Sequence, residues 1–277
     1  MAAFAFVPLA HTRSPMSSVT TPSPKDQIVL ITGSSSGIGR ATALAFAAAG
    51  ARLLLCARRL DRLETFRHEV EAAGAAAVHV FALDVQLRSA VETTLNSLPE
   101  AWKPVDILVN NAGLSRGLAK LQEDDPDNWE EMIDTNVKGL LYVTRSIVPG
   151  MLERGRGHVI SLGSTAGHQT YANGAVYCAS KAAERVISEG LRIDLIGTPV
   201  RVTSIDPGMT ETEFSAVRFR GDHERAASVY QDITPLQPED VADAILWAAT
   251  RPARVNIHTV LMTSIDQANS TVLHRHK

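Results

Sequence analysis

A tyrosine and a lysine lie four positions apart in the stretch VYCASKAAERV, residues 176–186. Residues i and i+4 are neighbours on one face of a helix, so Tyr177 and Lys181 would share a face. A free phenol is a poor base at neutral pH, but a nearby ammonium favours the phenolate. Such a pair can move a proton to or from a substrate oxygen. A half-buried ring beside a lysine with a solvated amine has the same spacing, so the pair alone decides nothing.

The glycine-rich stretch TGSSSGIG, residues 32–39, is a second feature that could bind a ligand. An apolar run precedes it and a helical pattern follows it, so it is predicted to join a strand to a helix. Glycines let the backbone turn tightly, and a helix N-terminus offers free N–H groups to a pyrophosphate. The spacing differs from the common G-x-G-x-x-G, and a purely structural turn would look similar. The residues predicted to bind a dinucleotide here are Gly33, Ser35, Ser36, Gly37, Ile38 and Gly39.

The end of the second predicted strand carries Arg58 and Arg59 and no acidic residue. An enzyme that binds NAD usually keeps an Asp or Glu about 20 residues after the glycine turn, where it binds a ribose hydroxyl. An arginine at this place can instead bind the 2′-phosphate of NADP. A solvated basic turn is the alternative interpretation. The position of the two arginines favours NADP(H) as the cofactor.

These residues must be positioned by a sheet, because short apolar runs alternate with helical patterns along the chain. Strands are predicted at 27–32, 51–57, 76–84, 105–113, 157–164, 200–208 and 255–262. Helices are predicted at 37–50, 59–74, 87–98, around 129–153, along 176–186 and at 238–250. The alternation predicts an α/β fold, a Rossmann-type doubly wound parallel sheet of about seven strands with helices on both faces. Ligands bind at the carboxyl ends of the strands in such a sheet.

The bulk composition is that of an ordinary globular domain, with 277 residues, of which 45% are hydrophobic and 21% charged. One catalytic domain is predicted over residues 26–262, followed by a C-terminal tail at 263–277. The net charge of −3 argues against a nucleic-acid partner, and no apolar run is long enough to span a membrane. The two cysteines, Cys56 and Cys178, lack metal-ligand spacing, so neither a disulfide framework nor a metal site is predicted.

Residues 1–25 differ from the rest of the chain because they contain no acidic residue and are rich in serine, threonine and proline. Such a composition cannot pack a core. We expect a disordered N-terminal extension or an organellar targeting segment, or else a start assigned too early, with Met16 or a later residue as the working N-terminus. Cysteine usage indicates a reducing compartment, and the cytoplasm is the expected location.

The motifs TGSSSGIG, NNAG (110–113), TNVKG with Asn136, the serine Ser164 and YCASK follow one another in order. With this set, the chain resembles the short-chain dehydrogenase/reductase family over residues 26–262. The resemblance implies four catalytic residues, which are Asn136, Ser164, Tyr177 and Lys181. Beyond the glycine turn and the arginines, it implies cofactor contacts from Asp84, Val85, Asn110, Ala112, Gly113, Tyr177, Lys181, Pro207, Gly208 and Thr210.

The resemblance also implies a role for each catalytic residue. Tyr177 would be the general acid or base of a hydride transfer, and Lys181 would supply charge and hold the nicotinamide ribose. Ser164 would stabilise charge on the substrate oxygen, and Asn136 would hold a water that links Lys181 to solvent. Taken singly, Ser164 could be a strand-end hydroxyl and Asn136 a cap at a helix kink.

Within the family, the segment TEFSAVRFRGD, residues 212–222, resembles the NADP-dependent 3-hydroxy acid dehydrogenases, including serine/allo-threonine dehydrogenases and malonic semialdehyde reductases. A small 3-hydroxy acid needs a cation for its carboxylate, and the guanidinium fork suits one. Arg218 and Arg220 are the candidates, although either could be exposed to solvent. Further substrate contacts are predicted from Ser164 and His168, with Gln169 and Tyr171 nearby.

Two other functions remain open at this point. A carbonyl reductase for a bulkier ketone or aldehyde could use the same scaffold, and an anion-binding arginine within 206–237 would distinguish the two activities. A non-catalytic NADP-binding sensor is the third hypothesis, which the complete catalytic set disfavours. The resemblance implies a homo-oligomer, a dimer or tetramer. The stretch after residue 260 departs from the pattern of the group, which puts oligomer contacts there in doubt.

Overall fold

Seven parallel strands form the centre of the molecule, in a computed structural model that describes residues 23–276. Their order across the sheet is β3-β2-β1-β4-β5-β6-β7, so the chain starts in the middle and winds outward in both directions. The predicted Rossmann-type α/β fold is therefore confirmed. The strands are β1 (Ile28–Thr32), β2 (Arg52–Ala57), β3 (Ala77–Ala82), β4 (Ile107–Asn110), β5 (Gly157–Leu162), β6 (Val200–Pro207) and β7 (Thr259–Met262).

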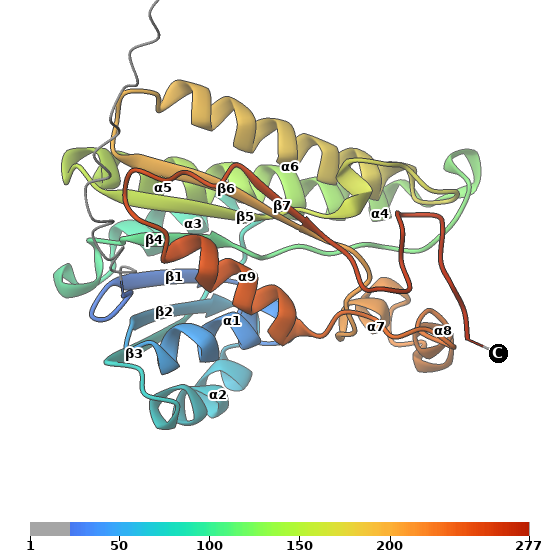
Figure 1. Cartoon of the computed structure of the whole chain (residues 1–277), viewed down its shortest axis with the longest axis horizontal. Coiled ribbons are helices and arrows are strands. Elements are labelled where there is room, and N and C mark those ends of the chain that lie inside the picture. Colours follow the sequence, from blue (N-terminus) through green and yellow to red (C-terminus); the bar gives the residue numbers. More distant parts are fainter. Residues whose placement is uncertain (1–22, 277) are drawn as a thin grey trace, which may run out of the picture.

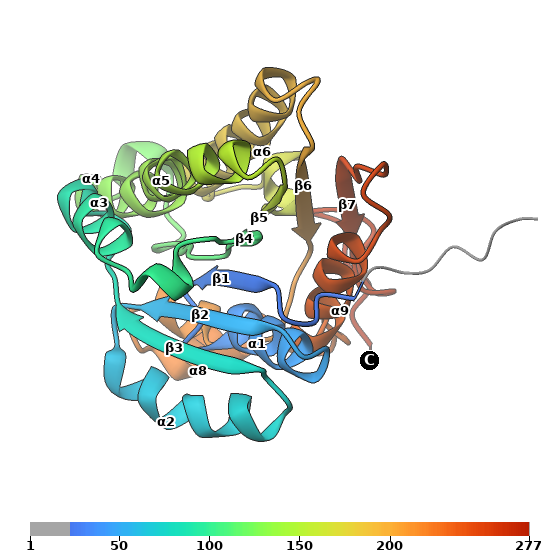
Figure 2. The same cartoon turned by 90° about the vertical axis from the view of Figure 1, so that its left-hand side faces the viewer.

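Helices cover both faces of the sheet, as Figure 2 shows along its edge. On one face lie α1 (Gly37–Ala48), α2 (Leu60–Ala72) and α9 (Pro238–Ala249). On the other lie α3 (Arg88–Asn96), α4 (Pro126–Ile133), α5 (Leu140–Glu153) and α6 (Ala175–Asp194). Two short helices, α7 (Phe214–Arg218) and α8 (His223–Ser228), lie beyond the carboxyl end of β6 (Figure 1). Single turns are η1 (Glu100–Trp102), η2 (Leu121–Glu123) and η4 (Thr165–Gly167), and η3 (Asp134–Gly139) is a π-helical segment between α4 and α5.

The central strands are apolar on both faces because both faces are buried. In β2, Leu53 and Leu55 pack into the core beneath α1, α2 and α9, whereas Leu54 and Cys56 pack into the core beneath α3 and α5. All four side chains are at most 1% exposed. Burying one such leucine stabilises the fold by about 2 kcal/mol, so a run without alternating polarity is what a strand in this position needs.

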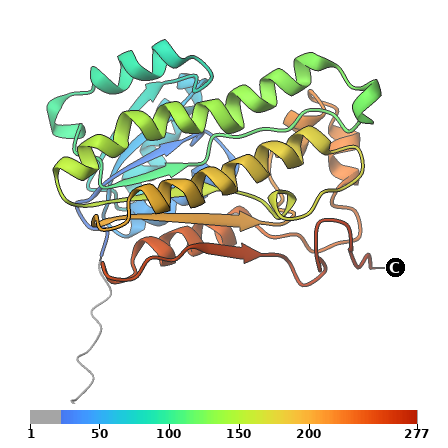
Figure 3. The same ribbon diagram turned by 90° about the horizontal axis from the view of Figure 1, so that it is seen from above.

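The carboxyl ends of the strands meet at one edge of the sheet, where the loops that follow them lie together (Figure 3). The loop after β4 braces the glycine turn after β1, because Asn111 Nδ2 donates to the carbonyls of Thr32 (2.8 Å) and Gly33 (3.0 Å). A Cβ on Gly39 would lie only 2.4 Å from Asn111 Nδ2. Gly39 therefore allows the first turn of α1 to approach the loop.

The residues after β7, which the sequence assigns to a C-terminal tail from residue 263, pack back onto the domain. Asp266 and Gln267 are buried, at 6% and 4% exposure. Gln267 Oε1 accepts a hydrogen bond from the backbone of Met209 (2.8 Å), and Asp266 accepts one from the backbone of Thr234 (2.7 Å). Both donors belong to residues 208–237, which we call the post-β6 segment.

The predictions for residues 1–25 fall outside the described range except at 23–25. Among the helices of residues 23–276, none combines the length and the hydropathy that a membrane crossing requires.

Candidate active site

A cavity of about 390 Å³ opens at the carboxyl edge of the sheet, between the glycine turn, the strand-end loops and the post-β6 segment. It brings together most of the residues that the sequence predicts to act. These are Gly33, Ser35, Ser36, Gly37, Ile38, Arg58, Arg59, Asp84, Val85, Ala112, Gly113, Ser164, Tyr177, Lys181, Pro207, Gly208, Thr210 and Arg218.

Tyr177 stands in the first turn of α6, and its side chain is almost buried at 8% exposure. The ring lies against Phe214, with 5.7 Å between the ring centroids. The guanidinium of Arg218 lies over the Tyr177 ring, 5.4 Å from its centroid. The phenol and a cation from the post-β6 segment thus border the same cavity.

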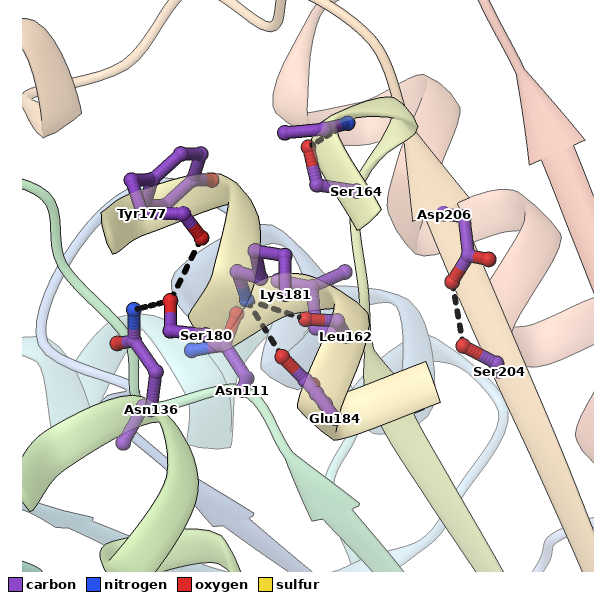
Figure 4. A network of polar contacts seen from close by, with 12 residues as sticks. Asn111, Asn136, Leu162, Ser164, Tyr177, Ser180, Lys181, Glu184, Ser204 and Asp206 are labelled. Atoms are coloured by element: carbon purple, nitrogen blue, oxygen red, sulfur yellow. Dashed lines mark hydrogen bonds and ion pairs between the residues drawn. The ribbon is translucent and has the colours of Figure 1, made fainter. Parts of the chain in front are cut away.

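Lys181 lies one turn further along α6 and is 5% exposed. Its Nζ donates to the carbonyl of Leu162 at the end of β5 (2.7 Å) and to Glu184 Oε2 (2.8 Å), as Figure 4 shows. Burial by itself lowers the pKa of Lys181, but the charge of Glu184 and the proximity of Tyr177 outweigh it and leave this pKa raised. The raised pKa favours the ammonium form of Lys181 at neutral pH.

Ser164 follows β5 and caps the single turn η4, where its Oγ accepts a hydrogen bond from the backbone of Ala166 (3.1 Å). The hydroxyl proton remains available to a substrate oxygen. Gly163 makes this placement feasible, because a Cβ there would lie 2.0 Å from Asp206 Oδ1 on the neighbouring strand.

Asn136 lies behind the cavity wall, in the π-helical segment η3, and is 1% exposed. Its Oδ1 accepts from the backbone of Leu114 (2.8 Å), and its Nδ2 donates to the Leu114 carbonyl (2.8 Å) and to Ser180 Oγ (3.0 Å). The side chain thus ties the loop after β4 to α6, and Figure 4 shows its bond to Ser180 of α6. Segments of π-helix are frequent at functional sites, and Asn136 lies within one.

Two predicted substrate contacts, His168 and Arg220, lie outside the cavity lining, so the structure does not bring them together with the other predicted residues. His168 Nε2 lies 2.5 Å from Asp206 Oδ2, and this buried carboxylate holds the ring away from the cavity. The side chain of Arg220 is 60% exposed and donates to Asn128 Oδ1 (2.9 Å). Each of these side chains bonds to a protein group that does not line the cavity either.

Asn110 and Gly39 also lie outside the cavity lining, although the sequence predicts cofactor contacts from them. Asn110 Nδ2 donates to Thr144 Oγ1 of α5 (2.9 Å), so this side chain anchors the strand end to a helix. Its neighbour Asn111 lines the cavity instead. Asn111 follows the last residue of β4 and bonds to the glycine turn, so it lies at the cavity edge.

Arg218 is the arginine that the post-β6 segment presents to the cavity. Its Nη2 donates to the Tyr171 hydroxyl (3.3 Å), whereas its buried Nε has no hydrogen-bond partner among the described residues. A guanidinium with an unused donor suits a carboxylate ligand. Burial raises the pKa of Tyr171, and Arg218 offsets only part of this rise, so Tyr171 is a neutral donor.

The two arginines after β2 line the other end of the cavity. Arg59 donates to Ser35 Oγ in the glycine turn (3.5 Å) and lies 3.6 Å from Glu213 Oε2. Glu213 also pairs with Arg62 of α2 at 3.0 Å. This carboxylate of the post-β6 segment therefore reaches across to the arginines beside the glycine turn.

Asn111, Glu184 and Gln267 are among the residues that sequence reasoning missed. Asn111 stood inside a recognised motif, but the motif does not say which of its two amides faces the cavity. Glu184 has the spacing of an ordinary surface pair with Lys181. Gln267, which lines the cavity, lies in the stretch that the sequence assigns to a tail.

The glycine turn and the tyrosine–lysine pair both fall within the part of the chain that a family comparison matches. Residues 27–222 match the family described as short chain dehydrogenase, and the chain belongs to this family.

Relatives and solved structures within the family narrow the comparison. The chain is 48% identical to the NADP-dependent 3-hydroxy acid dehydrogenase YdfG of Salmonella typhi over 242 residues, 87% of this chain and 96% of that one. It is 41% identical to the serine 3-dehydrogenase of Rhizobium radiobacter over 240 residues, 87% of this chain and 94% of that one. The closed form of a serine dehydrogenase complexed with NADP+ superposes with a TM-score of 0.85 at 45% identity, covering 91% of this chain and all of the other.

Proposed function

We propose that the protein is an NADP-dependent oxidoreductase that interconverts a small 3-hydroxy acid and its 3-oxo acid or semialdehyde. Substrates of this class include L-serine, L-allo-threonine and 3-hydroxypropionate. The observation that carries the proposal is the position of the Arg218 guanidinium, 5.4 Å from the centroid of the Tyr177 ring at the same cavity. A short hydroxy acid can meet the phenol with its hydroxyl and the guanidinium with its carboxylate.

The glycine turn fits the pyrophosphate of NADP(H). Gly33 and Gly37 have positive φ angles of 64° and 54°, which side chains rarely tolerate. Ser36, the N-cap of α1, makes no side-chain cap hydrogen bond, so the first N–H groups of the helix are available to an anion. Arg58 lines the cavity beside this turn and is the residue that we assign to the 2′-phosphate.

The side chains around Tyr177 manage the proton of the reaction. Bound NADP(H) supplies or accepts the hydride. Tyr177 takes the hydroxyl proton of the hydroxy acid during oxidation and returns it during reduction. Lys181 stabilises the phenolate through its charge, and Ser164 donates a hydrogen bond to the substrate oxygen as charge develops there. Asn136 holds the loop and the helix that position these groups, and we retain its predicted water contact as part of the proposal.

The substrate end of the cavity selects for a carboxylate. Arg218 has a donor without a partner among the described residues, and Tyr171 and the Tyr177 ring restrict where its guanidinium can lie. A neutral alcohol leaves this partly buried cation without a counter-charge, which is less favourable than pairing it with a carboxylate. The cavity should therefore select an acid, because the Arg218 guanidinium has a donor that only the substrate carboxylate would pair.

We further propose a cytoplasmic homo-oligomer, a dimer or tetramer. The outer face of α6 supports self-association because Val186 and Ile193, two turns apart, are 55% and 64% exposed. Light scattering during size-exclusion chromatography tests this proposal, and a monomer at micromolar concentration would contradict it. Residues 1–25 remain the candidate for an organellar signal, which imaging of full-length and truncated fusions would test.

Steady-state kinetics test the proposed activity most broadly. The panel compares L-serine, L-allo-threonine, 3-hydroxypropionate, 3-hydroxyisobutyrate and a neutral alcohol of similar size, each with NADP and with NAD. We expect the highest specificity constant for a hydroxy acid with NADP. A neutral alcohol that wins by about tenfold or more would overturn the assignment, since a carboxylate–arginine contact is worth at least that much.

A further inference from the structure

Glu184 is a buried carboxylate next to the reacting groups that the mechanism above leaves without a role. It is 2% exposed, in the second turn of α6 after Tyr177. Its Oε2 accepts a hydrogen bond of 2.8 Å from Lys181 Nζ, and among residues 23–276 no other donor reaches this carboxylate. Figure 4 shows the two side chains pointing toward each other inside the helix–sheet interface.

The hydrogen bonds of Lys181 show how the Glu184 carboxylate fixes the position of the ammonium. An ammonium has three N–H donors. The Leu162 carbonyl takes one at 2.7 Å and Glu184 takes a second at 2.8 Å. The third is left for the cavity that Lys181 lines. With two donors fixed by the protein, the direction of the third is fixed as well.

Burial makes the charge of Glu184 matter more than that of a surface residue. The side chains of Lys181 and Glu184 are 6% and 3% exposed, so solvent barely screens their attraction. A lone buried ammonium would lose its proton readily, because desolvation disfavours the charged form. Burial likewise raises the pKa of Glu184 to about 7, and Lys181 opposes this rise.

The other titratable groups around the pair already have partners of their own. Asp206, at the end of β6, is fully buried and acts on both pKa values. It accepts hydrogen bonds from Ser204 Oγ and faces His168 Nε2 at 2.5 Å. Tyr177 acts on Lys181 from the same helix. Glu184 is thus the carboxylate that bonds directly to the lysine.

We propose that Glu184 is a positioning residue: its carboxylate keeps Lys181 in the ammonium form and fixes Nζ between the Leu162 carbonyl and the cavity. The inference rests on the proposed function in one respect, that Lys181 acts together with Tyr177. Glu184 itself touches neither substrate nor cofactor, since it does not line the cavity.

The protonation of Lys181 can be measured without catalysis, by NMR of protein labelled with ¹³C at the lysine ε-carbons. The signal that disappears in Lys181→Met identifies the residue. In the wild type, the titration midpoint should lie at or above the value of about 10.4 for an exposed lysine. In Glu184→Gln, which keeps the shape of the side chain and removes its charge, the midpoint should fall by about one pH unit or more. Glu184→Asp should recover part of this fall.

A matched control is available on the outer face of the same helix. Glu189 has a side chain that is 58% exposed, and it pairs with Arg185 at 3.9 Å. Glu189→Gln removes the same charge from α6 and should leave the Lys181 midpoint unchanged. An equal midpoint in wild type and Glu184→Gln would overturn the inference. A wild-type midpoint well below that of an exposed lysine would overturn it independently of any variant.

Kinetic measurements test whether the charge of Glu184 affects the reaction. The ammonium form is present below the midpoint and is lost as pH rises through it. The alkaline limb of kcat for alcohol oxidation should therefore move to lower pH in Glu184→Gln, in step with the NMR midpoint, and stay in place in Glu189→Gln. If the NMR midpoint of Lys181 shifts in Glu184→Gln but the alkaline limb of kcat does not, the positioning role would be contradicted. Failure of the wild type on every hydroxy acid would instead refute the proposed function and leave the NMR result to decide the inference.

Discussion

The two sides of the cavity are built differently. On the sheet side, the groups that handle the proton are buried and bonded to the scaffold, with Asn136, Glu184 and Lys181 exposed by 1%, 2% and 5%. On the opposite side, the post-β6 segment presents its charges near the surface, and the side chain of Glu213 is 50% exposed. Its helices α7 and α8 have only five and six residues.

This difference separates the groups that carry out the reaction from the groups that select the substrate. Buried, mutually bonded groups cannot change partners without a large cost in free energy, so they act in the same way on any alcohol that reaches Tyr177. Short helices beside solvent can adjust to a ligand at low cost, and Arg218 is placed there to choose which alcohol that is. The predictions below test this division of labour.

The largest effect is expected from Tyr177→Phe on the sheet side. Loss of the phenolic proton should lower kcat by about 10²- to 10⁴-fold, the usual contribution of a general acid or base. Tyr230→Phe is the matched control, because this phenol also lines the cavity but donates to the carbonyl of Thr210 (2.9 Å). It should lose less than about tenfold. Turnover by Tyr177→Phe at the wild-type rate would refute the assignment of the base.

On the opposite side, Arg218→Met should lower kcat/KM for a 3-hydroxy acid by about 10- to 100-fold, the usual range for a hydrogen bond to a charged group. Arg220→Met provides the control, since its guanidinium bonds to Asn128 outside the cavity. The control should stay within about twofold of wild type. Equal losses in the two variants would show that the carboxylate does not bind Arg218.

Cofactor choice should respond to Arg58→Asp. The substitution places a negative charge where we assign the 2′-phosphate and offers a carboxylate to the ribose hydroxyls of NAD. The preference for NADP over NAD, measured as the ratio of kcat/KM values, should fall by about tenfold or more. Arg67→Asp makes the same charge change on the exposed face of α2, where Arg67 pairs with Glu71. An unchanged ratio in Arg58→Asp would show that this arginine has no part in selection.

The smallest effect is expected for Glu213→Gln. Glu213 pairs with Arg62 and Arg59 at 3.0 and 3.6 Å, but all three side chains are at least 44% exposed, so each pair is worth about 1 kcal/mol or less. Removing a negative charge beside the phosphate site should lower the Kd for NADP by a few-fold, and added salt should shrink this gain. Weaker binding of NADP by the variant would contradict the account.

The sheet side was also the more predictable side. Apolar runs, a glycine turn and residues at helical spacing carry local signals, so the fold, Tyr177 and Lys181 could be read from the sequence. The charges of the post-β6 segment carry no such signal, because nothing in the sequence shows that Arg218, at the end of α7, lines the cavity while Arg220, just beyond the helix, does not. Glu184 could not be predicted on the sheet side either. Its spacing from Lys181 is that of a surface pair, and only tertiary packing buries it.

The division of labour is tested most directly by measuring kcat/KM for two substrates in three proteins. The substrates are a 3-hydroxy acid and a neutral alcohol of the same length, and the proteins are the wild type, Tyr177→Phe and Arg218→Met. We predict that Tyr177→Phe lowers both values by the same factor, whereas Arg218→Met lowers the value for the acid alone. An Arg218→Met protein that keeps the wild-type ratio of acid to neutral alcohol would contradict the account.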